Sequence, residues 1–385
     1  MNKSRLWIFI AAAAATPIVG HAQENYKDVR TVNECKDAER HTVRTYTAEE
    51  TAFDGRPRNV ILMIGDGMGV SQVFSGITAN GGMLNLCNMK HIGFSKTQSA
   101  SNYVTDSAAG GTAISCGTKT YNGAIGMGPD TTVIPTILEI SDKNGKATGL
   151  VATSTIVHAT PGSFIGHVKN RSDYEGIALS FLDTDIDVFI GGGKHFFTDR
   201  ADKRNLFDEL ERKGYRIYES IDAARGDDRP HMGIITAWEH MAKASERGNI
   251  LEEATQKAID VLKADKNGFF MMVEGSQIDW GGHHNDTELL VGEMLDFDKA
   301  IGKALEFAVA DRNTLVVVTA DHETGGFANV GGDKESGLVK GGFCTGNHTA
   351  TMVPVFAFGP GAEQFQGIYE NTEIFNKIKE LCGLK

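Results

Sequence analysis

Apolar residues gather along the chain in short, nearly continuous runs, and these runs alternate with longer amphipathic segments. A continuous apolar run of this length predicts a strand that is buried on both faces of its sheet. Such runs occur at 59–64, 147–152, 188–191, 268–274, 314–320 and 353–359. Apolar positions with helical spacing, which predict amphipathic helices, occur at 134–143, 173–182, 205–213, 249–263, 288–310 and 372–381.

This alternation predicts an α/β fold. Strands separated by helices build a mostly parallel central sheet with helices on both faces, which gives three layers, α/β/α. Two segments interrupt the pattern. Residues 23–56 are polar and charged and are interpreted as an N-terminal arm, which leaves 57–385 as one large domain with insertions. The stretch 325–342 is rich in glycine, carries lysines and has no periodicity, so it predicts a surface insertion.

The first residues have the layout of a secretory signal peptide. Lys3 and Arg5 precede an uninterrupted apolar run at 6–15, and small residues then stand before Gln23. We therefore expect a cleavage that removes residues 1–22. The alternative, a short membrane anchor, is disfavoured because the run is too short to span a bilayer, and no later segment has the roughly 18 apolar residues of a spanning helix. The sequence predicts an exported protein, periplasmic or secreted, without a membrane span.

The net charge limits the classes of molecule that the protein can bind, and the cysteine count limits its disulfides. The formal net charge is −12, and this argues against nucleic acid as a partner, since phosphate backbones bind basic surfaces. A small phosphate substrate remains compatible, because bound cations can reverse the sign of the local charge. Five cysteines in an oxidising compartment allow one or two disulfides and leave at least one thiol over, with the pairing open. They are Cys35, Cys87, Cys116, Cys344 and Cys382.

Metal-competent side chains follow several of the expected strands. Asp66 follows the strand at 59–64 within a glycine-rich turn, Glu274 ends a later strand, and Asp321 and His322 end another. In a parallel sheet the carboxyl ends of the strands share one edge, where ligands collect, so we expect these groups to lie together. A tight turn with a helix-capping aspartate is the alternative for Asp66. The pair Asp321 and His322 is hard to explain as core, because burial without partners is costly.

Other positions add ligands and a nucleophile. Asp279 and His283 are four residues apart, so they can face one side of a helical turn, and mixed carboxylate and imidazole ligands suit zinc. His348 adds an imidazole from a loop just ahead of a strand. Ser107 is expected at a helix start, where free N–H groups and the helix dipole favour an incoming phosphoryl group. Each residue alone has a simpler reading as a cap or a solvated side chain. Together they suit a multi-metal hydrolase.

The motifs that contain these residues resemble those of the alkaline phosphatase family. The resemblance runs from about residue 59 to 359 and keeps the family's motif order and local spacing, which is highly specific. It implies an alkaline phosphatase-like catalytic domain at 57–385. The motifs are GDGMG at 65–69, VTDSAA at 104–109, HATP at 158–161, Arg171, VEGSQID at 273–279, TADHE at 319–323 and GNHT at 346–349.

The resemblance implies a site for two zinc ions and one magnesium ion. Three divalent cations and Arg171 would outweigh the carboxylates of the site and leave net positive charge for a phosphate dianion. The implied ligands are Asp279, His283 and His348 for the first zinc, Asp66, Asp321 and His322 for the second, and Asp66, Thr160 and Glu274 for the magnesium.

The resemblance also implies roles around these cations. Ser107 would be the nucleophile that is transiently phosphorylated. Arg171 would clamp two phosphate oxygens, and Asp106 would hold Arg171 in place. Two positions depart from one common form of the family. His158 stands where some members have aspartate near the magnesium, which leaves the identity of the third metal open. Trp280 stands where some members have a lysine that reaches toward the substrate phosphate, which leaves phosphate affinity open.

The implied reaction is metal-dependent hydrolysis of small phosphate monoesters through a phosphoserine intermediate, with release of an alcohol and inorganic phosphate. A related phosphodiesterase or sulfatase is the second hypothesis, but those enzymes typically use threonine or a modified cysteine as the nucleophile. A non-catalytic phosphate or metal scavenger is the third, and it would bind phosphate without turnover. The sequence leaves the oligomeric state open, although members of the family are often homodimers.

Overall fold

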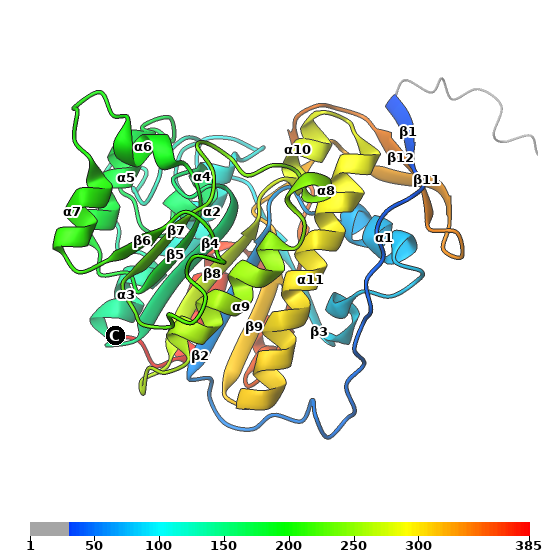
Figure 1. Cartoon of the computed structure of the whole chain (residues 1–385). Helices are drawn as coiled ribbons and strands as arrows, with labels where there is room; N and C mark the ends of the chain where they lie inside the picture. The colour runs from blue at the N-terminus through cyan, green and yellow to red at the C-terminus, as the bar shows by residue number, and fades with distance from the viewer. Residues whose placement is uncertain (1–30) are drawn as a thin grey trace, which may run out of the picture.

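The computed structural model describes residues 31–385. Its centre is a ten-stranded sheet with the strand order β15-β3-β14-β9-β2-β8-β4-β5-β7-β6. Of these ten strands only β14 runs antiparallel to its neighbours, β3 and β9, so the sheet is mostly parallel, as predicted (Figure 1). The strands are β2 (Asn59–Gly65), β3 (His91–Lys96), β4 (Ala147–Thr155), β5 (Val188–Gly192), β6 (Arg216–Tyr218), β7 (Met232–Ile235), β8 (Phe269–Gly275), β9 (Thr314–Thr319), β14 (Val353–Phe358) and β15 (Gly367–Glu370).

Helices cover both faces of this sheet, because alternate residues of a strand point to opposite sides. In β2, Ile61 and Met63 join the core beneath α1, α9 and α11. Val60, Leu62 and Ile64 join the core beneath α2, α3, α5, α7 and α12. The predicted three-layer α/β/α fold is confirmed. The helices are α1 (Val70–Ala79), α2 (Ser107–Cys116), α3 (Ile137–Lys143), α4 (Ala159–Gly162), α5 (Tyr174–Asp183), α6 (Lys194–Thr198), α7 (Leu206–Arg212), α8 (Ala244–Arg247), α9 (Ile250–Leu262), α10 (Ile278–His283), α11 (Thr287–Asp311) and α12 (Thr372–Leu381), with short 3₁₀ helices at Asn85–Asn88 and Ala362–Phe365.

The predicted strands and helices are all present, with small differences at their ends. Helix α3 begins at Ile137 because Thr136 caps it: the Thr136 hydroxyl accepts from Glu139 N, and the Glu139 carboxylate accepts from Thr136 N. The apolar pattern does not predict β3, β6, β7 and β15. They are short or lie near the sheet edges, where exposed residues such as Ile92 and Ile368 break the apolar run.

The glycine-rich stretch 325–342 has more regular structure than its lack of periodicity predicts. It contains β11 (Ala328–Asp333) and most of β12 (Leu338–Phe343), which pair antiparallel. Strand β12 also pairs with β1 (Thr31–Cys35) from the N-terminal arm. The predicted surface insertion thus has regular β structure, because β11 and β12 pair with each other and β1 of the arm adds a third strand. Its place is the expected one, since these strands form a small separate sheet at the periphery (Figure 1).

The predicted signal peptide, residues 1–22, and the first part of the arm, 23–30, lie outside the described residues. Within 31–385, no helix combines the length and the apolar character that crossing a bilayer requires. All five cysteines fall in this part of the chain and are free thiols, so the disulfides that the sequence allowed are not formed.

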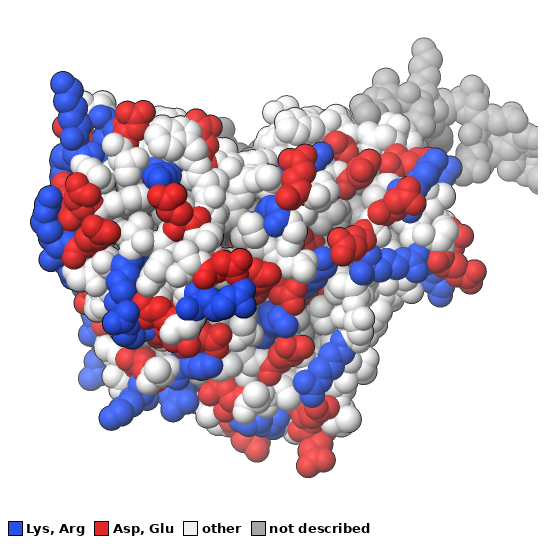
Figure 2. All heavy atoms as spheres, in the orientation of Figure 1, with Lys and Arg blue, Asp and Glu red and all other residues white. Residues whose placement is uncertain are grey.

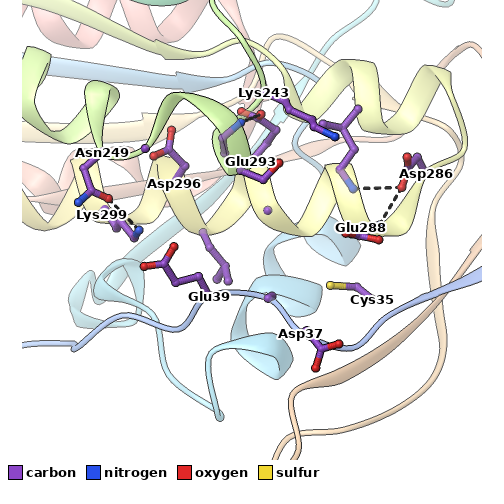
Figure 3. A pocket seen from close by; sticks show the side chains of 17 residues that line it. Cys35, Asp37, Glu39, Lys243, Asn249, Asp286, Glu288, Glu293, Asp296 and Lys299 are labelled. Atoms are coloured by element: carbon purple, nitrogen blue, oxygen red, sulfur yellow. Dashed lines mark hydrogen bonds between the residues drawn. The ribbon is translucent and has the colours of Figure 1, made fainter.

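The arm continues from β1 along α11, and a cavity is lined by the arm, by α11 and by residues 243–249 at α8 (Figure 3). The cavity has a volume of about 420 Å³, and its lining includes Cys35 and Glu39 of the arm and Glu293 and Asp296 of α11. The last two carboxylates each accept a hydrogen bond of 2.6 Å from Arg247. They are therefore committed to a buried ion-pair network, and the metal-competent clusters of the described chain lie elsewhere.

Candidate active site

The carboxyl ends of β8, β2 and β9 lie side by side at one edge of the sheet. Strand β2 pairs in parallel with both neighbours, and Ile64 is in register with Glu274 of β8 and with Thr319 of β9. Asp66 directly follows the end of β2, and Asp321 lies two residues after the end of β9. The register therefore brings three carboxylates from distant parts of the chain to one place, as expected for parallel strands.

A glycine allows the turn after β2 to approach the next ligand closely. Gly67 has a φ of 73°, and a Cβ at this position would lie 2.8 Å from Asp279 Cα. Gly67 N also lies 3.4 Å from Asp321 Oδ1, to which it donates. A left-handed backbone without room for a side chain requires glycine. In the GDGMG motif, Gly67 is therefore required by the backbone conformation, whereas Asp66 is a candidate metal ligand.

Three sets of side chains offer ligand atoms that lie within 4.8 Å of one another. One is the set that the resemblance implies for the first zinc, and another matches the magnesium set with His158 in place of Thr160. The third holds Asp279 where the second-zinc set was expected to hold Asp321, although Asp321 Oδ2 is 3.3 Å from His322 Nε2. The sets are Asp279, His283 and His348; Asp66, His158 and Glu274; and Asp66, Asp279 and His322.

Three histidines turn the same ring nitrogen toward this cluster. Nδ1 of His283 lies 2.8 Å from Gly346 O, and Nδ1 of His348 lies 3.0 Å from Thr105 O. Since a carbonyl can only accept, each Nδ1 donates, and the proton of the neutral ring is placed there. Nδ1 of His322 contacts a threonine hydroxyl at 3.2 Å. Nε2 of all three rings is left as the electron-pair donor, which is the arrangement typical of metal-binding histidines.

A two-stranded sheet places His348 in the cluster. Strand β10 (Glu323–Thr324) pairs with β13 (His348–Thr349), with Thr324 opposite His348. The ring centroids of His348 and His322 are 3.5 Å apart, and Nε2 of His348 lies 3.1 Å from Nε2 of His283. In the sequence His348 is an isolated loop histidine. The pairing of β10 with β13 gives it a fixed place.

Several ligand atoms in the cluster are buried without a hydrogen-bond partner among the described residues. They include Asp66 Oδ1, Glu274 Oε1, Asp321 Oδ2 and His158 Nδ1. A buried polar atom without a partner is costly, and an ionised carboxylate is the costliest case. Carboxylate oxygens and imidazole nitrogens are ligands that zinc and magnesium accept. The residues therefore fit bound divalent cations.

Burial and mutual repulsion change the pKa values of the carboxyl groups in this cluster. Burial, followed by the charges of Asp321 and Asp279, raises the pKa of Asp66 well above its usual value. Burial also raises the pKa of Glu274 and the pKa of Asp321 to about 7 each. Burial opposes ionisation of Asp279 too, but in the absence of a cation the protonated ring of His283, whose Nε2 lies 3.3 Å from Asp279 Oδ2, and nearby imidazoles outweigh it and hold the pKa of Asp279 well below its usual value. A divalent cation would displace the protons that these carboxyl groups bind.

Ser107 is the first residue of α2, and its hydroxyl faces the cluster. Ser107 is 2% exposed, and its Oγ lies 3.1 Å from His322 Nε2. The helix cap is the neighbouring Asp106, whose carboxylate accepts from Ala109 N at 3.0 Å. Ser107 is therefore not the capping residue, which was its simpler reading from the sequence.

Small residues let α2 pack directly on the ligand-bearing strand end. A Cβ added at Gly110 would lie 3.0 Å from Asp321 O, and one added at Gly111 would lie 2.5 Å from Ser163 Oγ. These contacts leave little room for larger side chains. The helix that carries Ser107 is thus held close to Asp321.

Arg171 reaches the start of α2 through Asp106. Arg171 Nη1 lies 3.3 Å from Asp106 Oδ2, and Gly123 N donates to the same oxygen at 3.0 Å. Arg171 N donates in turn to Gly123 O at 2.7 Å. The side chain of Arg171 remains 25% exposed. Asp106 therefore holds the arginine beside Ser107 and leaves part of it accessible to a ligand.

Residues that the sequence did not single out surround Glu274. Ser276 Oγ and Ser154 Oγ lie 2.5 Å and 3.3 Å from Glu274 Oε2. Thr160, which the resemblance did assign, has its Oγ1 3.3 Å from Asp66 Oδ2. No local spacing marks the two serines, because the register of β4 against β8 brings them together.

The two departures from the common family pattern are also linked. The ring of His240 contacts both Trp280 and His158, with centroid distances of 4.8 Å and 5.6 Å. Trp280 follows Asp279 on α10, so it lies next to a ligand of the cluster. His240 carries no motif signal, and only the folded loop places it here.

A parallel sheet whose carboxyl edge gathers carboxylates, imidazoles and a buried serine defines a metal-dependent hydrolase. A family model described as alkaline phosphatase matches residues 57–341. Alkaline phosphatase 4 of Bacillus subtilis is 36% identical over 83% of this chain and 88% of that protein. Alkaline phosphatase of Escherichia coli is 31% identical over 89% of each chain. The solved alkaline phosphatase of the Antarctic bacterium TAB5 is 45% identical, with a TM-score of 0.82 over 86% of this chain and 99% of that chain.

The chain belongs to the alkaline phosphatase family. It is a metal-binding phosphatase that hydrolyses phosphate monoesters. A mutant of the Antarctic enzyme, in which one histidine is replaced by glutamate, has been solved with magnesium bound in its M3 site.

Proposed function

We propose that phosphate monoesters are hydrolysed here through a phosphoserine at Ser107. Ser107 Oγ loses its proton to solvent and attacks phosphorus, and the bond from phosphorus to the ester oxygen breaks. The electron pair of that bond leaves with the alcohol oxygen, which takes up a proton from solvent. Water then attacks the phosphoserine, which releases inorganic phosphate and restores the hydroxyl. The supporting observation is the 3.1 Å contact between Ser107 Oγ and His322 Nε2, within a cluster of cation ligands.

The cofactors that we propose are two zinc ions and one magnesium ion. When bound, these cations supply positive charge that favours an ionised hydroxyl and stabilises phosphate oxygens. His158 lies near Asp66 and Glu274 and is proposed to adjoin the third cation. The proposed ligands are Asp279, His283 and His348 for the first zinc, Asp66, Asp321 and His322 for the second, and Asp66, Thr160 and Glu274 for the magnesium.

The remaining proposed residues bind the phosphate group of a small monoester. The planar guanidinium of Arg171 suits two phosphate oxygens at once, and Asp106 fixes its orientation through the 3.3 Å contact. The free N–H groups at the start of α2 face the same place and favour an anion. Trp280 is proposed to border the bound phosphate, next to Asp279.

The substitution Ser107→Ala tests the nucleophile. It should lower kcat/KM for an aryl phosphate by roughly a thousand-fold or more, because no other hydroxyl replaces the attacking atom. Metal content should stay unchanged, since Ser107 is not a proposed ligand. The matched control is Ser115→Ala, which removes the same atom from the same helix where Ser115 Oγ donates to Ser163 O at 2.6 Å. Near-normal turnover by Ser107→Ala would remove Ser107 from this role.

A monoester and a diester of the same aryl alcohol separate the alternative functions. The proposed enzyme should strongly prefer the monoester, because Arg171 pairs best with unesterified phosphate oxygens. A preference for the diester would favour the phosphodiesterase hypothesis. Stoichiometric phosphate binding without turnover of either substrate would favour the scavenger hypothesis.

We also propose that residues 1–22 are a signal peptide, that 23–56 form an arm on a catalytic domain at 57–385, and that the protein is periplasmic or secreted. The support is the basic and apolar layout of the first residues. N-terminal sequencing of protein from the exported fraction should begin at Gln23. A chain that still begins at Met1 would contradict this processing.

A further inference from the structure

A loop at 236–243, between β7 and α8, crosses the sheet edge that carries the site. Met241 N donates to Thr153 O at 3.2 Å, and Gly193 N donates to Ala237 O at 3.0 Å. Gln277 Nε2 donates to Met241 O at 3.0 Å, which ties the loop to the residue just before α10. The loop is thus bonded to β4, to the end of β5 and to the start of α10.

The close fit of this loop extends to its backbone. A Cβ added at Gly192 would lie 2.0 Å from Glu239 O, so the end of β5 approaches the loop as closely as a residue without a side chain permits. Thr155 N donates to His240 Nδ1 at 3.1 Å. Because Nδ1 accepts this bond, the proton of the neutral His240 ring lies on Nε2, and the bond is one more link between the loop and the end of β4.

The ring of His240 contacts the side chains of both Trp280 and His158. Its plane makes an angle of 83° with the Trp280 ring at a centroid distance of 4.8 Å. The angle with the His158 ring is also 83°, at a centroid distance of 5.6 Å. Both are edge-to-face contacts, the favoured geometry for such rings. One imidazole therefore limits the rotation of two neighbouring side chains.

These two neighbours belong to different parts of the site. Trp280 directly follows Asp279, a residue of two of the cation-ligand sets, and His158 is a member of the set with Asp66 and Glu274. His240 itself is in none of the three sets. Its contacts therefore connect the surroundings of two proposed cations while it supplies no ligand to either.

We propose that His240 is a positioning residue: its ring holds Trp280 and His158 in the orientations that set phosphate affinity and retention of the third cation. This rests on the proposed function, because it takes Trp280 as a residue that borders the phosphate and His158 as a neighbour of the third cation. The ring, and not the hydrogen bond to Thr155, carries the effect on Trp280 and His158.

Two substitutions separate the ring from the hydrogen bond. His240→Asn keeps an acceptor for Thr155 N but removes the ring, whereas His240→Phe keeps a ring and removes the acceptor. Both are made in a Trp238→Phe background. The chain has three tryptophans, and Trp7 lies in the proposed signal peptide, so Trp280 is then the sole tryptophan of the processed protein. Its fluorescence reports on the ring contact without any dependence on turnover.

With zinc and magnesium supplied, His240→Asn should raise KM for an aryl phosphate and the inhibition constant of inorganic phosphate by about two- to ten-fold, the range for loss of one aromatic edge-to-face contact. The kcat at saturating metal should change less than KM. Trp280 emission should shift to longer wavelength, and less magnesium should remain bound after gel filtration. His240→Phe should match the background protein in KM, phosphate inhibition constant, kcat and retained magnesium to within about two-fold, with the Trp280 emission wavelength unchanged.

Three results would overturn the proposal. One is an unchanged KM, phosphate inhibition and Trp280 emission in His240→Asn. Another is equal impairment of His240→Phe, which would assign the effect to the hydrogen bond. The third is a lower melting temperature in both variants with an unchanged KM, which would mean a purely structural role. Failure of the proposed function is distinguishable, because it would show as full activity of Ser107→Ala whatever the emission of Trp280 does.

Discussion

At the scale of single residues, Asp106 joins two parts of the site. One of its oxygens accepts from Ala109 N and so begins α2, and the other accepts from Gly123 N and Arg171. The position of Ser107, the first residue of that helix, and the position of the guanidinium are therefore coupled through one carboxylate. Its roles as helix cap and as arginine anchor are compatible because a carboxylate offers several acceptor sites.

The substitution Arg171→Ala should weaken inhibition by inorganic phosphate more than it slows hydrolysis of an aryl phosphate with a good leaving group. In the proposed role the guanidinium contributes mainly to binding phosphate oxygens, whereas departure of a good leaving group needs little help. The measurement is the phosphate inhibition constant beside kcat for the same substrate. Arg171→Lys is the matched control, since it keeps the charge and loses the two-pronged geometry. A larger loss in kcat than in phosphate affinity would mean that the role of Arg171 is misassigned.

The residues that sequence reasoning found and the residues that it missed differ in how they reach the site. Asp66 and Asp321 end their own apolar strands, so the strand pattern locates them without knowledge of any partner. Ser154 and Ser276 meet because β4 and β8 pair, and Ser154 N donates to Ser276 Oγ at 3.0 Å. No local spacing carries that register. His240 is hidden for a similar reason, because its place depends on a loop bonded to three separate elements.

At the scale of elements, α8 and α11 are joined by a buried ionic network. Arg247 of α8 lies 2.6 Å from a carboxylate oxygen of Glu293 and of Asp296 on α11, and these three side chains are only 1–3% exposed. Burial raises the pKa of both carboxyl groups, against the lowering effect of Arg247. The contact between α8 and α11 therefore depends on the Arg247 guanidinium, which keeps the two carboxylates charged.

The substitution Arg247→Met should lower the free energy of unfolding by roughly 3–5 kcal/mol, because it leaves buried carboxylates without their partner. Urea unfolding, followed by circular dichroism, measures this change. Lys243→Met is the control, because Lys243 is the residue just before α8, the helix that carries Arg247. It should have a far smaller effect, since Lys243 pairs only with the exposed Glu246. Equal effects of the two substitutions would mean that the network contributes little.

The elements themselves were predictable where their cause is local. The six long central strands are apolar on both faces, and helices such as α11 carry a helical apolar stripe, so the pattern identifies them. Strands β1 and β12 escape such reasoning. Residues Val32 and Gly342 are paired across nearly the whole chain, and Val32 is 47% exposed. The exposed strand β1 therefore shows no alternation to detect, and in β12 glycines at 341 and 342 interrupt the run between the buried residues Val339 and Phe343.

At the scale of the whole molecule, the protein is acidic although it acts on anionic substrates. Its net charge is −12, and acidic and basic side chains are interspersed over the face shown in Figure 2. The overall field therefore does not attract a phosphate dianion. The attraction must arise locally, at the carboxyl edge of the sheet, where the proposed cations and Arg171 would outweigh the ligand carboxylates. The same cations should also control the stability of the molecule, because they bind the folded state alone.

Chelation should therefore destabilise the protein, and by more at pH 8 than at pH 5. In the chelated protein the pKa values of Glu274 and Asp321 are raised to about 7, from unfolded values of about 4.3 and 3.9. The folded state then binds more protons than the unfolded state, so this contribution to stability is complete below pH 4 and is lost as the pH rises through 7. Bound cations reverse this pH dependence of stability, because they need ionised ligands.

Calorimetric melting temperatures of loaded and chelated protein should diverge as the pH rises. The pKa of Asp66 is raised as well, so the control is the triple variant Asp66→Asn, Glu274→Gln, Asp321→Asn, whose chelated form should lose most of this pH dependence. A gap that stays constant from pH 5 to pH 8 would contradict the cluster as the source of the effect.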